Sequence, residues 1–205
     1  MCKSDYHIHP LNHRYWKTPP AELKNLALTE DDRFWVRNVV EWCVYERNLH
    51  SIALTDHDMT QSSLYAQQYA KENFLNLHIV VGAECEVSVP GFPPDKNWAH
   101  ILCYGTHVLP DYSNNTPLPE FVDAARVLGA YLVLAHPVMY PHVFDKYHSL
   151  FDGYEEQSGV TPVFRPSTSL PVTLRKFHNS DFHYQHDLPC RSDPRLWTNH
   201  FVLDV

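Results

Sequence analysis

Short runs of apolar residues alternate along this chain with segments whose apolar residues recur at helical spacing. The short runs predict strands, because a buried strand of a parallel sheet is a continuous apolar stretch bounded by turn residues. Strands are expected at residues 4–9, 52–55, 79–89, 98–104, 131–135, 151–156, 177–181 and 201–204.

Three segments between these runs carry the signals of helix ends. Thr29 can cap a helix whose first turn is acidic, and Phe34, Val39, Val40 and Cys43 follow at helical spacing. A polar helix is expected over residues 62–73. Thr116 and Pro117 open a third helix over residues 121–128, which ends before Gly129. By contrast, the region 161–175 contains too many prolines for a full helix.

Alternating strands and helices predict a mostly parallel sheet with helices packed against it. Nearly all the residues that could bind a metal fall at the carboxyl ends of predicted strands, and His100 is the exception. Barrel enzymes place their chemistry at that end of their strands. We therefore expect one domain over residues 1–205, built as a closed or distorted β/α barrel rather than an open sheet.

Composition limits the classes of function. The formal net charge of −8 argues against a basic surface for duplex nucleic acid, although carboxylates that hold cations also count in it, so a nuclease is not excluded. No apolar run reaches the roughly 18 residues of a membrane span, and we expect no leader peptide. Five scattered cysteines without a C-x-x-C pair predict a reduced, cytoplasmic protein.

Histidines and carboxylates gather at the predicted strand ends. His7 and His9 are two residues apart on a strand, so both side chains point to one face and can hold one ion. Imidazole and carboxylate ligands suit manganese, zinc or iron, and no thiolate is needed. The candidate metal ligands are His7, His9, His57, Glu84, His100, His136, Asp181 and His183.

Taken together, the motifs around these residues resemble the PHP family, named for polymerase and histidinol phosphatase. The resemblance covers nearly the whole chain. Its last motif and Thr55-Asp56-His57-Asp58 are most similar to the branch that acts on nucleoside 3′,5′-bisphosphates and trims short RNA ends. The matching stretches are Asp5-Tyr6-His7-Ile8-His9, Leu54-Thr55-Asp56-His57-Asp58, Gly82-Ala83-Glu84, His100-Ile101-Leu102-Cys103-Tyr104-Gly105, Leu134-Ala135-His136-Pro137 and Ser180-Asp181-Phe182-His183.

The resemblance implies a distorted (β/α)7 barrel of the TIM type that holds two or three divalent ions of Mn, Zn or Fe. The implied activity is metal-dependent hydrolysis of a phosphate monoester or diester in a small phosphorylated metabolite, a nucleotide or an oligonucleotide end. The implied ligand sets are His7, His9, Glu84 and Asp181 for one ion, Glu84 as a bridge to a second ion on His100 and His136, and His57 with His183 for a third.

The chain departs from the family pattern in the loop at residues 10–20. The family usually places a ligand to the third ion there, but Arg14 stands at that position, and His13 is the candidate substitute. The planar guanidinium of Arg14 also matches phosphate oxygens. Arg14 therefore joins Glu84, Asp181 and His183 as a candidate catalytic residue.

Asp5, Asp56 and Asp58 flank the candidate ligands. We expect Asp5 and Asp58 to orient ligand imidazoles by accepting the N–H that faces away from the ion. Asp56 either does the same or caps the loop that follows it.

Two other functions remain open. An amidohydrolase also uses H-x-H on the first strand of a barrel, but that class usually adds a bridging lysine, and no lysine stands at a matching strand end. A non-catalytic metal-binding PHP module tends to lose ligands, whereas this chain keeps nearly all of them. Histidinol phosphate, a nucleoside bisphosphate and an oligonucleotide end each present a phosphate to the same ions, so the substrate stays open.

Overall fold

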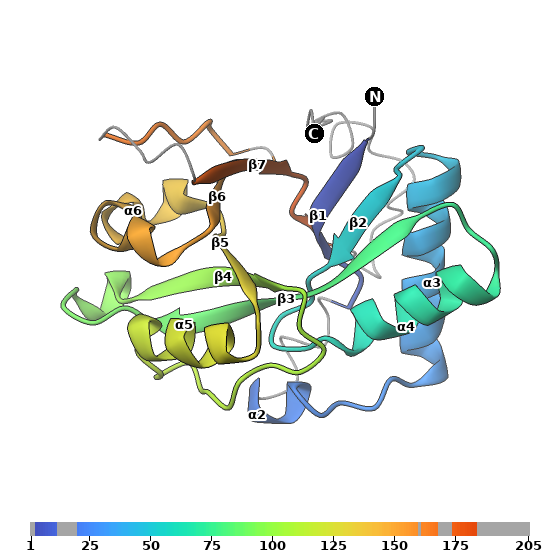
Figure 1. Ribbon diagram of the computed structural model, residues 1–205, viewed down its shortest axis with the longest axis horizontal. Coiled ribbons are helices and arrows are strands. Elements are labelled where there is room, and N and C mark those ends of the chain that lie inside the picture. The colour runs from blue at the N-terminus through green and yellow to red at the C-terminus, as the bar shows by residue number, and fades with distance from the viewer. Residues whose placement is uncertain (1–2, 12–19, 160, 168–173, 184–205) are drawn as a thin grey trace.

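The computed structural model describes residues 3–11, 20–159, 161–167 and 174–183. These residues form one curled sheet in the strand order β7-β6-β5-β4-β3-β2-β1-β8 (Figure 1). The strands are β1 (Ser4–His9), β2 (Ser51–Leu54), β3 (His78–Ser88), β4 (Trp98–Tyr104), β5 (Tyr131–Leu134), β6 (Gly153–Ser158), β7 (Arg175–Asn179) and β8 (Phe182–His183).

The three predicted helices are present as α3 (Glu30–Tyr45), α4 (Gln61–Glu72) and α5 (Leu118–Val127). Thr29 caps α3 as expected: its side chain accepts a hydrogen bond from the Asp32 backbone N–H, and the Asp32 carboxylate accepts one from the Thr29 N–H. Two unpredicted helices, α2 (Pro20–Leu23) and α6 (Pro141–Tyr147), are too short to show a helical period. No helix in the described ranges has the length and apolar character that a membrane crossing requires.

Some sequence expectations need correction or lie outside the described residues. Phe34 is 46% exposed, so it does not belong to the buried face of α3. Three short 3-10 helices interrupt the loops at Pro94–Lys96, Pro137–Met139 and His148–Leu150. Residues 161–167 contain no helix, as their prolines predict. The strand expected at 201–204 lies outside the described residues.

The sheet is mostly parallel, as predicted, but β4 runs antiparallel to both of its neighbours, β3 and β5. The connection from β3 to β4 is a short loop with a single 3-10 turn and no crossover helix, so the chain must reverse direction. The first residues of β4 therefore lie at the same edge as the carboxyl ends of the parallel strands. This reversal brings His100, near the start of β4, to the edge at which β1, β2 and β5 end, while Glu84 reaches the same place from the interior of β3.

The expected closed barrel is not what the described residues form. They make a half-barrel whose β7 arches across the open side of the curl toward β1 (Figure 1). Side-chain contacts link β7 to β1 across this opening. The Tyr6 backbone N–H donates to Asn179 Oδ1 at 3.0 Å, and the Tyr6 and Phe177 rings meet edge to face. The sheet stays open here because no backbone ladder links β7 to β1 in the part of the chain described.

Apolar clusters cover both faces of the sheet. Outside β1 and β2, valines of α3 pack with Ile52 and Leu54, while Phe121 of α5 and Phe144 of α6 pack outside β3 to β6. A smaller cluster, which includes Leu102 and Val133, fills the inside of the curl. This inner cluster packs beneath the polar residues at the strand ends.

Gly153 provides a test of the close pairing of β6 with β7. A Cβ atom at this position would lie 2.6 Å from Phe177 Cε2 and 2.7 Å from the Arg175 carbonyl oxygen. The carbonyl belongs to the paired strand and cannot move away without breaking the ladder. Gly153→Ala is therefore expected to lower the free energy of unfolding by about 1–3 kcal/mol, as overpacked sites do, measured by urea titration. Unchanged stability would contradict the described pairing.

Candidate metal centre

The Glu84 carboxylate occupies the middle of a ring of histidines at the edge where the strands end. Glu84 lies on β3 and is only 1% exposed. Five imidazole nitrogens lie within 3.3 Å of its two oxygens. Oε1 faces His7 Nε2 at 3.3 Å, His100 Nδ1 at 3.1 Å and His136 Nε2 at 3.0 Å, and Oε2 faces His9 Nε2 and His57 Nδ1, both at 3.3 Å.

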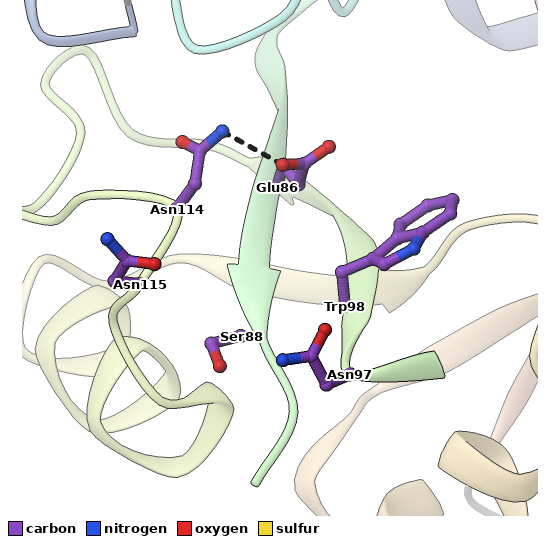
Figure 2. Close-up of a pocket in the computed structure, with 6 residues that line it drawn as sticks. All are labelled: Glu86, Ser88, Asn97, Trp98, Asn114 and Asn115. Atoms are coloured by element: carbon purple, nitrogen blue, oxygen red, sulfur yellow. Dashed lines mark hydrogen bonds between the residues drawn. The ribbon is translucent and has the colours of Figure 1, made fainter. Parts of the chain in front are cut away.

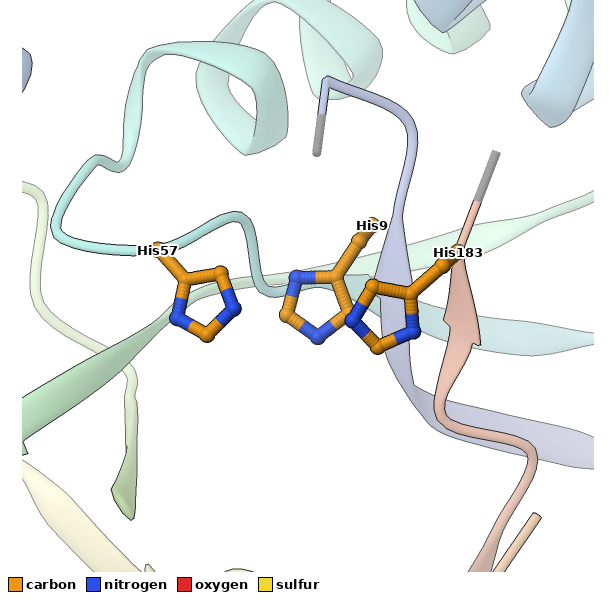
Figure 3. Close-up of side chains that lie close together, drawn as sticks. All are labelled: His9, His57 and His183. Atoms are coloured by element: carbon orange, nitrogen blue, oxygen red, sulfur yellow. The ribbon is translucent and has the colours of Figure 1, made fainter. Parts of the chain in front are cut away.

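Asp181 adds a second carboxylate to this ring. Its Oδ1 lies 3.3 Å from His7 Nε2 and 3.5 Å from His9 Nε2. His9, His57 and His183 form a row of facing imidazoles, with ring centroids 4.8 Å apart for His9 and His57 and 4.3 Å apart for His9 and His183 (Figure 3). All eight predicted ligands therefore lie together in the structure.

Separate segments carry these side chains to one place. His7 and His9 belong to β1, His57 to the loop after β2 and His100 to β4, while His136 follows β5 directly. Among the described residues, five that are not glycine have a positive φ, and three of them belong to this site: Asp58 (56°), His136 (26°) and Asp181 (50°). Such backbone conformations cost free energy and persist where the surroundings enforce them, as at functional sites.

Hydrogen bonds fix which nitrogen of several rings faces the centre. His7 Nδ1 lies 2.9 Å from Glu155 Oε1, so this nitrogen donates its hydrogen to the carboxylate and leaves Nε2 toward Glu84. His183 Nδ1 lies 2.9 Å from the Asp181 carbonyl oxygen, which can only accept. These contacts leave Nε2 of His7 and of His183 with a lone pair, as a metal ligand requires.

Tyr140 acts on His136 in the same way. The Tyr140 hydroxyl donates to the Ala135 carbonyl oxygen at 2.7 Å and accepts from the His100 backbone N–H at 3.1 Å. Its single hydrogen is thereby used, so His136 Nδ1, at 3.0 Å, donates to the hydroxyl oxygen. His136 Nε2 is then left to face Glu84.

Glu155 is a functional residue that the sequence did not reveal. It is fully buried on β6, and besides His7 it accepts from the His136 backbone N–H at 2.8 Å and from Asn179 Nδ2 at 2.8 Å. One carboxylate thus orients two candidate ligands. Its only sign in the sequence was a carboxylate near the end of the strand predicted at residues 151–156, which lacks a clear apolar run.

Glu155→Gln is expected to weaken metal binding about 10- to 100-fold, the usual effect of losing a group that orients a ligand. Glutamine keeps the shape, but its NH₂ group must face one of the three donors that the carboxylate accepts. The affinity is measured by titration of the metal against a competing chelator. Glu156→Gln is the matched control, because the neighbouring Glu156 contacts Lys176 and His178 instead. Equal affinities in the two variants would refute the role of Glu155.

The aspartates beside the ligands act differently from the expectation. Asp5 Oδ1 accepts from the backbone N–H groups of His7 and Ser180, so it ties β1 to the segment before β8 through the main chain rather than through an imidazole. Asp58 accepts from the Tyr112 hydroxyl. Asp56 caps the loop after β1, because its Oδ1 accepts from the Leu11 backbone N–H at 2.7 Å.

The centre contains ionised carboxylates together with histidines whose pKa values are shifted in opposite directions. Burial would raise the pKa of Glu84, but the imidazoles of His100 and His7 outweigh burial and hold it well below its usual range. Burial lowers the pKa of His57 to about 4, whereas the carboxylates of Glu84 and Glu86 overcome burial at His100 and raise its pKa to about 10.

This donor set fits divalent ions. His7 Nε2, both ring nitrogens of His9 and Asp181 Oδ1 are buried and make no hydrogen bond to any described residue. Such atoms require a partner, and a cation between them would provide it. Four groups of three side chains place their ligand atoms within 4.8 Å of one another: His7–His9–Asp181, His7–Glu84–His136, His57–Glu84–His100 and His9–His57–His183.

These groups differ in two respects from the sets that the resemblance implied. His57, expected at the third ion only, also lies with Glu84 and His100, and His136 lies with His7. The two remaining predicted site residues, His13 and Arg14, lie outside the described residues, as does most of the 10–20 loop.

Comparison with known proteins gives a match in fold. No protein-family model matches the sequence, and no curated protein matches it either. A solved structure of a two-domain protein containing a predicted PHP-like metal-dependent phosphoesterase, from Bacteroides vulgatus ATCC 8482, is 15% identical with a TM-score of 0.51. The match covers 89% of this chain and 52% of that one, so the chain spans about half of that protein.

Two other solved structures are similar over most of their length. A protein from Bifidobacterium adolescentis ATCC 15703, assigned as a metal-dependent phosphoesterase, is 14% identical with a TM-score of 0.56, and the match covers 89% of this chain and 88% of that one. An amidohydrolase from Chromobacterium violaceum, solved with bound sulfate and no metal, is 15% identical with a TM-score of 0.54 and the same coverage. The described residues thus share the fold of PHP-like proteins.

Proposed function

We propose that this protein is a metal-dependent phosphoesterase that hydrolyses a phosphate monoester or diester. The observation that carries the proposal is Glu84, whose two oxygens face five histidines from four separate segments. One carboxylate between two sets of imidazoles is the arrangement that holds a pair of divalent ions close together. The fold shared with PHP-like phosphoesterases supports the same reading.

The contacts around Glu84 support a division of these residues between two ions. His7, His9, Asp181 and Glu84 would hold one ion, and Glu84 would also serve a second ion together with His100 and His136. His57 belongs both to the group with Glu84 and His100 and to the row with His9 and His183, so it could serve an ion in either group. Bound divalent ions would neutralise phosphate charge and lower the pKa of the water that attacks phosphorus.

The side chains of the protein define how a substrate approaches. The Asp181 side chain is 21% exposed and that of His183 is 33% exposed, whereas Glu84, His7 and His9 are almost completely buried. A phosphate group therefore enters past Asp181 and His183. Arg14, counted from sequence as a phosphate ligand, would act from the loop that follows β1.

The amidohydrolase similarity favours a second candidate reaction, hydrolysis of an amide at the same centre. The known amidohydrolase pattern adds a lysine between the ions. Here the group between the histidines is Glu84, and in the described residues no lysine contacts the candidate ligands. The phosphoester reaction is therefore the better supported of the two.

The test is a substrate panel with metal-loaded protein. Histidinol phosphate, a nucleoside 3′,5′-bisphosphate, a short 5′-phosphorylated RNA and an aryl phosphate are assayed for hydrolysis, beside an N-acyl amino acid as the amide. Phosphate release that disappears in Asp181→Asn would support the proposal, and the preferred ester would identify the branch. Amide hydrolysis alone, or no turnover by protein shown to hold its ions, would refute it.

A further inference from the structure

Figure 2 shows the residues that line a polar pocket of about 300 Å³, which lies next to the candidate metal centre because two of these residues contact His100. Two of its residues contact His100 directly. Glu86 Oε2 lies 3.4 Å from His100 Nε2, and the Trp98 ring centroid lies 5.2 Å from that of His100. A group bonded to a phosphate at the metal centre can therefore extend into this pocket. The lining residues are Glu86, Ser88, Asn97, Trp98, Asn114 and Asn115.

Two of the lining residues are held in place by neighbours. Asn114 Nδ2 donates to Glu86 Oε1 at 2.8 Å, so the carboxylate is fixed between Asn114 and His100. The Trp98 ring meets the Tyr140 ring edge to face, with centroids 5.6 Å apart. The pocket therefore has a fixed aromatic side and a fixed carboxylate, which reduces the entropy lost when a ligand binds.

Three other polar groups around the pocket are available to a ligand. The Ser88 hydroxyl and the side-chain amides of Asn97 and Asn115 make no hydrogen bond to any residue in the described ranges. Figure 2 shows the Asn97 and Asn115 carboxamides on opposite sides of β3 with Ser88 between them. Each carboxamide offers two donor hydrogens and an acceptor oxygen, and the hydroxyl offers one hydrogen and two lone pairs.

The charge of the residues that line the pocket limits which ligands can bind there. The only charged side chain is the Glu86 carboxylate, and none of the six residues is a lysine or an arginine. A second phosphate would therefore meet a carboxylate and no cation. A hydroxyl group suits the pocket, because it can donate to Glu86 and also bond with the carboxamides. The Trp98 ring offers an apolar face for the carbon atoms of a small ring.

We infer that this pocket binds a neutral ring that carries hydroxyl groups, the sugar portion of the phosphorylated substrate. The inference rests on the proposed phosphoesterase function, since the phosphate at the metal centre places the sugar beside His100. A ribose in a nucleoside monophosphate and the ring of a hexose phosphate share this chemistry, so both belong in the test.

The experiment compares substrates with and without the ring. For metal-loaded wild-type protein, Asn97→Ala and Asn115→Ala, kcat and KM are measured with a nucleoside monophosphate, a hexose phosphate and an aryl phosphate. Each variant is expected to raise KM for the preferred sugar-bearing ester about 10-fold, the effect of losing one or two hydrogen bonds, and to leave the aryl phosphate unchanged. Asn73→Ala is the control, because that amide contacts the Tyr69 carbonyl oxygen at the end of α4.

A binding measurement separates this inference from the proposed function. NMR titration with methyl riboside and methyl glucoside, which carry no phosphate, reports the pocket without turnover. A glycoside that binds wild-type protein and binds Asn97→Ala about 10-fold more weakly supports the pocket even if no ester is hydrolysed. Ester hydrolysis with identical KM values in all variants, or no glycoside binding in a protein that hydrolyses nothing, overturns the inference.

Discussion

Glu84→Gln is expected to remove bound metal and to lower turnover of the preferred ester by at least about 100-fold, beyond the effect of losing an orienting group. Glutamine fits the space, but its amide carries no charge and replaces one acceptor oxygen with a donor. The imidazoles of His7, His100 and His136 would then face a group that cannot balance a cation. In the proposed arrangement both ion positions depend on this carboxylate, so both should empty together.

The measurement is metal content by elemental analysis, beside turnover of the same samples. Glu46→Gln is the control, since Glu46 stands on the exposed end of α3 and contacts none of the ligands. Circular dichroism establishes that the variant is folded. A Glu84→Gln protein that keeps its full metal content would show that Glu84 does not hold the ions.

Metal removal is the second change with a large expected effect. Several buried ring nitrogens and a carboxylate oxygen of the centre make no hydrogen bond to described residues, and the carboxylates of Glu84 and Asp181 each lie 3.3 Å from His7 Nε2. An ion that binds the folded protein at 100 times its Kd adds about 2.7 kcal/mol of stability. For a chain of this size, chelation is therefore expected to lower Tm by about 5–10 °C.

The test is thermal unfolding after dialysis against a chelator, followed by addition of Mn²⁺, Zn²⁺ or Fe²⁺ to separate samples. The ion that restores the highest Tm identifies the preferred metal. Glu84→Gln serves as the control and should show no recovery. A Tm that is the same with and without metal would contradict a metal centre built into the fold.

Much of the site could be predicted because its ligands lie close to strand ends. Side chains two apart on a strand, and polar residues directly after an apolar run, can be read without knowing how the strands pair. The sequence identified His100 as a candidate ligand but did not predict where it lies, because its position depends on the reversal of β4. The short loop before β4 was the local sign of that reversal.

Glu155 could not be found in this way. Its strand reads Gly153-Tyr154-Glu155-Glu156-Gln157-Ser158, which lacks an apolar run, and its partners His7 and His136 are distant in sequence. The open sheet could not be predicted from local sequence patterns either, because closure of the barrel depends on whether β7 pairs with β1. Where β7 approaches β1, the Asn179 side chain accepts from the Tyr6 backbone N–H in place of a backbone ladder.

The position of β8 beside β1 sets the order in which the parts of the candidate metal centre can come together in a newly made chain. His7 and His9 emerge first during synthesis, but Asp181 and His183 come from the segment that pairs with β1 only after β7 has been made. A nascent chain that ends at β7 holds the histidines around Glu84 without the second carboxylate. A site that includes both carboxylates can therefore be complete only after residue 183 has left the ribosome.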